Sequence, residues 1–199
     1  AADIFLPVYK DSDGLDGYVS LEINPRLAYK TQETIEEARR LFQKVNRPNV
    51  MFKVPATGAG FSAIEGLTAL GININSTLIF SLEQYINTAH AYIRGIKRIL
   101  QDKGGVSRVH SVVSVFVSRI DTSVDNLLDQ LQVKEGSHLK GKAAVSNSAL
   151  IYQKYLEIFS SGDFKALQEK GSHLQRVLWG STSTKNTAYS DIKYVSELI

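Results

Sequence analysis

A single lysine of this 199-residue chain stands inside an apolar run. Lys53 occupies the middle of the segment MFKVP at residues 51–55, and no other lysine has such a setting. Lysine is almost never fully buried without a partner. An amine kept away from water, or set beside another cation, is partly unprotonated and can attack a carbonyl carbon. The alternative is a lysine at a strand end that extends its amine into solvent, and sequence position alone does not separate the two.

A carboxylate is predicted to lie on the same side of the fold as Lys53. Glu22 belongs to residues 18–23, which have the alternation of a strand and would be a neighbour of the lysine strand. A carboxylate beside a reactive amine can carry protons during a reaction. The two residues would form a structural salt bridge equally well, so both roles stay open at this point.

Polar and apolar residues alternate in four predicted strands. The apolar set is Val19, Leu21, Ile23, Val50, Phe52, Val54, Ile72, Ile74, Leu78, Val113, Val115 and Val117, and the opposing set is Ser20, Glu22, Lys53, Asn73, Asn75, Thr77, Ser114 and Phe116. Because alternate side chains face opposite sides of a sheet, each strand has one apolar face. A parallel sheet covered on both faces would read as continuous apolar runs. The pattern therefore favours a shared polar interior, as at the catalytic mouth of a barrel, over half-exposed antiparallel strands.

Helices are predicted between the strands, as in parallel α/β folds. We expect strands at 18–23, 49–54, 72–80, 112–117 and 176–181. We expect helices from Thr31 as the cap to about 45, after a turn at 58–60 through to 70, from 82 to the Gly104-Gly105 pair, at 122–131 and at 139–159. Periodicity does not choose between a (β/α)₈ barrel and a doubly wound sheet, and either would be one domain over residues 1–199.

Groups suited to a phosphate follow the last two predicted strands. Ser114 and Arg119 flank the carboxyl end of one, and the hydroxyl-rich residues 181–186, which include Lys185, follow the other. A hydroxyl and a guanidinium at this end of a parallel sheet suit a sugar phosphate. Hydroxyl-rich loops are common, so the second segment carries less weight.

Composition excludes several classes of protein. The net charge is +3, but the 23 basic residues are scattered among 20 acidic ones, which does not predict a nucleic-acid surface. No apolar run approaches the ~20 residues of a membrane span, and the first residues have no signal-peptide pattern. There are no cysteines, and the four histidines have no metal-ligand spacing, so we expect no metal site.

Five segments of the chain, taken together, resemble the active-site motifs of transaldolases. They are VSLE at 19–22 with Pro25-Arg26, VMFKVPAT at 50–57, GININSTLIFS at 71–81, FVSRID at 116–121 and WGSTSTKN at 179–186 with Ala188-Tyr189 soon after. The segments occur in family order over nearly the whole chain. Any one of them would be weak, but the set is specific.

The resemblance implies a role for each position. Lys53 would form a Schiff base with a ketose, while Glu22 and Thr77 would hold a water that relays protons. Asn75 would bind the dihydroxyacetone part, and Phe116 would line the pocket. The phosphate would be bound by Ser114, Arg119 and Lys185, the last standing where many members carry Arg.

The family reaction moves a dihydroxyacetone unit from a ketose phosphate, such as sedoheptulose 7-phosphate or fructose 6-phosphate, to an aldose phosphate. It belongs to the pentose phosphate pathway and uses neither metal nor organic cofactor. We accordingly expect a cytoplasmic transferase with sugar-phosphate substrates and no nucleic-acid or membrane partner, and we leave self-association into a homo-oligomer open. The rivals are a fructose 6-phosphate aldolase-like enzyme and a barrel fragment without activity.

The family fold is a (β/α)₈ TIM barrel, and this chain matches only about strands three to seven of its eight. The resemblance puts the acid/base Asp of the first strand and an Asn of the second before Ala1, and the eighth strand after Ile199. Open edge strands beside an apolar face invite aggregation. We therefore expect an incomplete barrel here, part of a longer natural chain, inactive and aggregation-prone if made alone.

Overall fold

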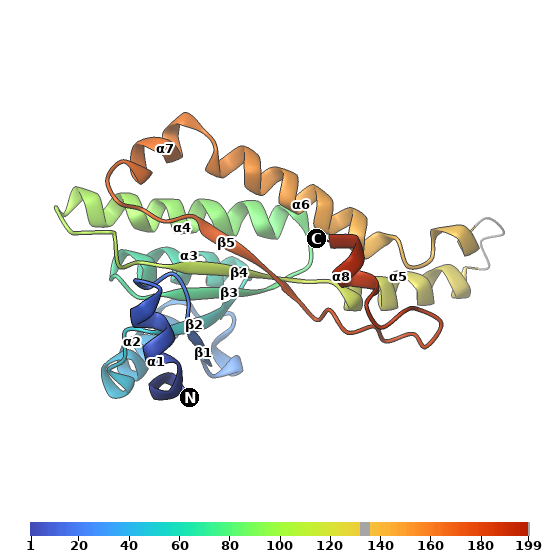
Figure 1. Cartoon of the computed structure of the whole chain (residues 1–199), viewed down its shortest axis with the longest axis horizontal. Helices are drawn as coiled ribbons and strands as arrows, with labels where there is room; N and C mark the ends of the chain where they lie inside the picture. The colour runs from blue at the N-terminus through green and yellow to red at the C-terminus, as the bar shows by residue number, and fades with distance from the viewer. Residues whose placement is uncertain (132–135, 199) are drawn as a thin grey trace.

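The computed structural model describes residues 1–131 and 136–198 as five parallel strands with helices between them (Figure 1). The strands are β1 (Val19–Glu22), β2 (Val50–Pro55), β3 (Ile74–Ile79), β4 (Ser111–Phe116) and β5 (Gln175–Gly180). The helices are α1 (Ala2–Asp11), α2 (Thr31–Val45), α3 (Gly58–Ala69), α4 (Leu82–Gln101), α5 (Ser118–Gln130), α6 (Ala143–Phe159), α7 (Gly162–Gln168) and α8 (Lys193–Leu198). Two short 3₁₀ turns, η1 (Pro25–Leu27) and η2 (Gly136–Leu139), complete the described elements.

The strand order identifies the architecture. Strands pair in chain order, β1-β2-β3-β4-β5, and every pair is parallel. A doubly wound sheet reverses its strand order at a switch point, whereas a barrel keeps chain order throughout. The sheet is therefore a five-stranded part of a (β/α)₈ barrel, with β1 and β5 at its edges, which confirms the predicted fold class.

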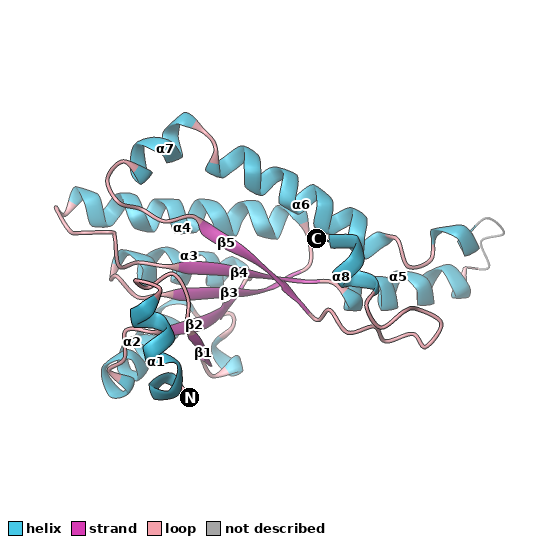
Figure 2. Cartoon of the chain, in the orientation of Figure 1, coloured by secondary structure: helices cyan, strands magenta, loops and turns pink. Residues whose placement is uncertain are grey.

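The helices α2, α3, α4, α6 and α7 cover one face of the sheet (Figure 2). Phe52 and Ile74 pack with the inner residues of α2 and α3, while Val113 and Val115 pack with those of α4, α6 and α7. The residues predicted for the apolar face of β2 and β4 are therefore in the core. The other face of the same strands carries the polar residues.

The longest helix shows how the sequence builds this layer. The Ser81 hydroxyl caps α4 by accepting a hydrogen bond from the Gln84 N–H at 3.2 Å. Tyr85, Tyr92 and Ile96 are buried at helical spacing against the sheet. Such burial contributes about 1.5–3 kcal/mol for each large side chain, so packing, more than the cap, holds this helix in place.

Three details of the prediction were wrong or incomplete. Thr31 is not a cap: it is the first residue of α2, and its hydroxyl donates to the Ala59 carbonyl oxygen at 2.9 Å. Leu78 leaves the apolar face. Its φ of 62° and a register shift between Ser76 and Ile79 turn its side chain outward, and Ile79 is buried instead. Helices α1, α7 and α8 were not predicted.

No helix among residues 1–131 and 136–198 is both long and apolar enough to cross a membrane.

Candidate active site

The polar face of the sheet forms a row of paired positions. Glu22 on β1 is in register with Lys53 on β2, which is in register with Asn75 on β3. Strand parity sets this row, because all three residues occupy the face away from the helices. Three of the residues predicted for the site therefore come from three consecutive strands and lie side by side.

Lys53 and Glu22 form an ion pair within this row. The Lys53 Nζ lies 3.0 Å from Glu22 Oε1, and the side chains are 25% and 73% exposed respectively. A pair this exposed contributes about 0–1 kcal/mol to stability. The Lys53 side chain is thus less buried than its place inside an apolar run predicts. Its partner is a carboxylate within proton-transfer distance of the amine.

Asn75, in the middle of the sheet, forms hydrogen bonds with side chains on β1 and β4. Its Nδ2 donates to the Ser20 hydroxyl on β1 at 2.9 Å, and its Oδ1 accepts from the Ser114 hydroxyl on β4 at 2.7 Å. The first bond crosses over β2 directly beside Lys53. Asn75 and Ser114 are both buried, so these bonds satisfy groups that would otherwise be costly to bury. The amide is held in one orientation next to the amine.

Thr77 is the next residue of β3 on this face. It is opposite Pro55 in register and is nearly buried, at the carboxyl side of the Lys53–Asn75 pair. The irregularity at Leu78 follows immediately. The regular pairing of β3 with β4 is therefore interrupted next to Thr77.

Aromatic and cationic groups meet beyond the ends of β3 and β4. Phe116 packs edge-on against Phe80, with ring centroids 5.4 Å apart. The guanidinium carbon of Arg119, in the first turn of α5, lies 5.0 Å from the centre of the Phe116 ring. This cation–π contact leaves Arg119 exposed beyond the end of β4. Phe80 was not among the predicted site residues, although its place directly after a strand could have indicated its contact with Phe116.

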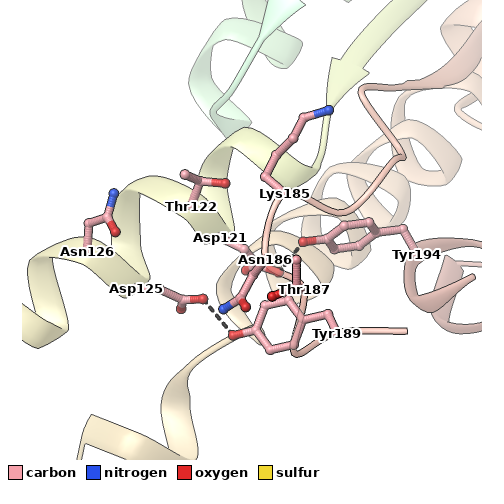
Figure 3. Close-up of a pocket in the computed structure, with 9 residues that line it drawn as sticks. All are labelled: Asp121, Thr122, Asp125, Asn126, Lys185, Asn186, Thr187, Tyr189 and Tyr194. Carbon is pink, nitrogen blue, oxygen red and sulfur yellow. Dashed lines mark hydrogen bonds between the residues drawn. The ribbon is translucent and has the colours of Figure 1, made fainter. Parts of the chain in front are cut away.

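Lys185 lies apart from this row, in the loop after β5. Its Nζ donates to the Ser183 hydroxyl at 2.7 Å. It lines a cavity of about 280 Å³ whose walls come from α5, this loop and α8 (Figure 3). The lining residues are Asp121, Thr122, Asp125, Asn126, Lys185, Asn186, Thr187, Tyr189 and Tyr194. Figure 3 shows the Lys185 amine directed away from the two aspartates, and Lys53 is not among the residues that line this cavity.

The histidines do not join the polar row. His110 stacks on His173, with ring centroids 4.1 Å apart, near the amino-terminal ends of β4 and β5. Burial, and then the nearby His173 and Arg176, lower the pKa of His110 to about 4, so it is neutral at physiological pH. Within the described residues no group of three or more His, Cys, Asp or Glu side chains is arranged to hold a metal ion.

A profile of the family described as Transaldolase/Fructose-6-phosphate aldolase matches residues 1–199. The chain belongs to this family. Membership confirms the resemblance to transaldolases that the five motifs indicated.

Named transaldolases are similar to the chain over its whole length. It is 47% identical over 208 residues to Transaldolase 2 of Nostoc sp., an alignment that covers 100% of this chain and 55% of that protein. It is 45% identical over 207 residues to the transaldolase of Trichodesmium erythraeum and 44% over 200 residues to that of Mycobacterium tuberculosis, each covering 100% of this chain and 54% of the relative. The chain spans about half the length of these relatives.

Proposed function

We propose that the chain carries the Schiff-base centre of a transaldolase. The observation that supports this most strongly is the Lys53 amine, 3.0 Å from a carboxylate and in register with Asn75 on the interior face of a parallel sheet. The similarity to named transaldolases supports the same reaction. The three-carbon unit would come from sedoheptulose 7-phosphate or fructose 6-phosphate.

The chemistry assigns Lys53 as the nucleophile. Its unprotonated amine adds to the ketose carbonyl carbon, and loss of water gives an iminium ion on the lysine. The bond between C3 and C4 of the sugar, one carbon beyond the iminium carbon C2, then breaks as the C4 hydroxyl loses its proton, and the aldose phosphate leaves with C4 as its aldehyde carbon. The dihydroxyacetone unit remains on Lys53 as an enamine, adds to the acceptor aldehyde, and is released by water. Each stage needs a group that accepts and returns a proton.

Glu22 is the group that we propose for these proton transfers. Its carboxylate oxygen is within hydrogen-bond distance of the amine and can take its proton before attack. Thr77, on the same face of β3, is proposed to hold the relaying water together with Glu22. Asn75 is proposed to bind the hydroxyls of the dihydroxyacetone unit, since its amide is fixed beside Lys53 by Ser20 and Ser114.

The phosphate end of the substrate is proposed to bind beyond the carboxyl ends of β4 and β5. Arg119 and Lys185 supply two cations there, and Phe116 carries the ring on which Arg119 rests. Ser114 would join them by turning its hydroxyl from Asn75 to the phosphate, because a hydroxyl has one proton to donate. We further propose that the enzyme works in the cytoplasm without metal or organic cofactor.

A transfer assay tests the proposed reaction against its rivals. With sedoheptulose 7-phosphate and glyceraldehyde 3-phosphate, a transaldolase forms fructose 6-phosphate and erythrose 4-phosphate. A fructose 6-phosphate aldolase would instead release free dihydroxyacetone from fructose 6-phosphate without an acceptor. An inert barrel segment would do neither. The assay should use the protein as it is naturally made, and release of dihydroxyacetone at the transfer rate would contradict the proposal.

Replacing Arg119 with alanine should weaken fructose 6-phosphate binding far more than dihydroxyacetone binding. The guanidinium is exposed and rests on the Phe116 ring, so its loss removes a charge-assisted contact with phosphate of about 1.5–3 kcal/mol without disturbing the core. Half-saturating concentrations for the two ligands provide the measurement. Arg108→Ala, which removes an exposed arginine before β4, is the matched control. Equal losses for both ligands would mean that Arg119 only positions the loop.

A further inference from the structure

The loop after β5 is fixed to α5 at its start. The Ser118 N–H donates to the Ser181 carbonyl oxygen at 2.9 Å, and the two hydroxyls lie 3.0 Å apart. Just before them, the Val117 N–H donates to the Gly180 carbonyl oxygen at 3.0 Å. The loop therefore begins against the same helical turn that carries Arg119.

A second contact attaches the loop to α5 at Tyr189. The Tyr189 hydroxyl donates to Asp125 Oδ2 at 2.6 Å, while Asp125 Oδ1 accepts the Gly141 N–H at 2.9 Å (Figure 3). Burial, and then the neighbouring Asp125, raise the pKa of Tyr189, so its hydroxyl keeps the proton that it donates. Gly141 has a φ of 69°, and a Cβ there would lie 2.8 Å from the tyrosine ring. The ring is thus seated against a position that accepts only glycine.

Asp121, one helical turn before Asp125, makes an equivalent pair with α8. Its Oδ2 accepts from the Tyr194 hydroxyl at 2.7 Å, and its Oδ1 accepts the Ala144 N–H at the start of α6 at 2.7 Å. Both aspartates are buried and use both oxygens. The Lys193 amine lies 5.5 and 5.6 Å from the rings of Tyr189 and Tyr194, which places a cation beside the two pairs.

Lys185 lies between these two attachments of the loop, and its amine donates to the Ser183 hydroxyl within the loop itself. Its position relative to Arg119 therefore depends on how the loop is held at Ser181 and at Tyr189. A cation that must meet a phosphate together with a second cation binds well only if their separation is fixed in advance. The attachment at Tyr189 is part-buried and charge-assisted, because its acceptor is a carboxylate, and the charge makes it the stronger constraint.

We infer that Asp125 and Tyr189 are positioning residues for phosphate recognition, a role that rests on the proposed transaldolase function. They hold the loop so that Lys185 and Arg119 act on the same phosphate. Asp121 and Tyr194 hold α8, which continues the loop, in the same manner. None of these four residues touches the substrate.

Tyr189→Phe tests the inference, because it removes the hydroxyl and keeps the ring seated against Gly141. The half-saturating concentration of fructose 6-phosphate in borohydride trapping at Lys53 should rise about tenfold, as expected for loss of a hydrogen bond to a charged group. The value for dihydroxyacetone, which has no phosphate, should stay within about twofold of the parent. Tyr152→Phe, on the outer part of α6, is the matched control and should change neither value.

Two results would overturn the inference: unchanged values for both ligands, or equal losses for both, which would indicate a role in folding alone. Calorimetric titration with inorganic phosphate gives a second measurement that does not depend on catalysis. Its dissociation constant should also rise about tenfold in Tyr189→Phe. If the parent is not trapped at Lys53, the proposed reaction fails, but the phosphate titration still decides whether Tyr189 positions the loop.

Discussion

Replacing Lys53 with methionine should abolish transfer of the dihydroxyacetone unit, with a fall of at least about 10⁴-fold, because the covalent intermediate can no longer form. Methionine has an unbranched apolar chain of similar length and suits the stem of a side chain that is 25% exposed. The fold should therefore persist. The measurement is the transfer rate, with the thermal unfolding midpoint as a check on the fold.

Lys97→Met is the matched control for this substitution. Lys97 is exposed on α4, on the helix layer away from the polar row, so its loss should leave the rate unchanged. A Lys53→Met variant that stays folded and retains more than a few per cent of the activity would exclude Lys53 as the nucleophile.

Glu22→Gln should slow transfer by about 10²–10⁴-fold, the usual contribution of a positioned acid/base. Glutamine keeps the size of the side chain but cannot accept the proton of the Lys53 amine. Because the Glu22 side chain is 73% exposed, the lost ion pair removes only about 0–1 kcal/mol of stability. Formation of the Schiff base should remain measurable, since the nucleophile itself is intact, and turnover and trapping are measured on the same sample.

Glu33→Gln is the control for loss of a paired carboxylate. Glu33, in the first turn of α2, forms an exposed ion pair with Lys30 at 3.8 Å. The Glu33→Gln substitution should leave the transfer rate unchanged. If Glu22→Gln differs from the parent by less than about twofold, Glu22 has only a structural role and the usual acid/base contribution is absent.

Strand parity carried most of what the sequence could predict. The alternation around Lys53 and Ser114 placed polar residues on one face and valines on the other, and the structure has this arrangement. The pairing of Glu22 with Lys53 followed because both lie on the same face of adjacent strands. Periodicity could not choose between a barrel and a doubly wound sheet, and the observed strand order decides it.

Contacts between distant segments could not be predicted. The bonds from Asp125 to Tyr189 and from Asp121 to Tyr194 join residues 64 and 73 positions apart, and no local pattern marks either pair. The bond from Asn75 to Ser20 crosses an intervening strand, which strand parity does not describe. The sequence therefore indicated which residue types form the site, but not the long-range contacts that orient them.

The helices that escaped prediction are short or atypical. Helix α1 contains Pro7 and buries none of its residues, so it lacks the apolar stripe of a packed helix. Helices α7 and α8 have only 7 and 6 residues, too few for helical periodicity to be visible. The turn at Leu78 was missed because a leucine with positive φ is rare and has no sequence signal.

Borohydride trapping with fructose 6-phosphate tests the central claim most directly. Reduction of the iminium ion would fix the dihydroxyacetone unit to the lysine that formed it, and peptide mass spectrometry would identify that residue. The account predicts a single modified lysine, Lys53, in the protein as it is naturally made, with no label when the sugar phosphate is omitted. No covalent label, or a label on any other lysine, would contradict it.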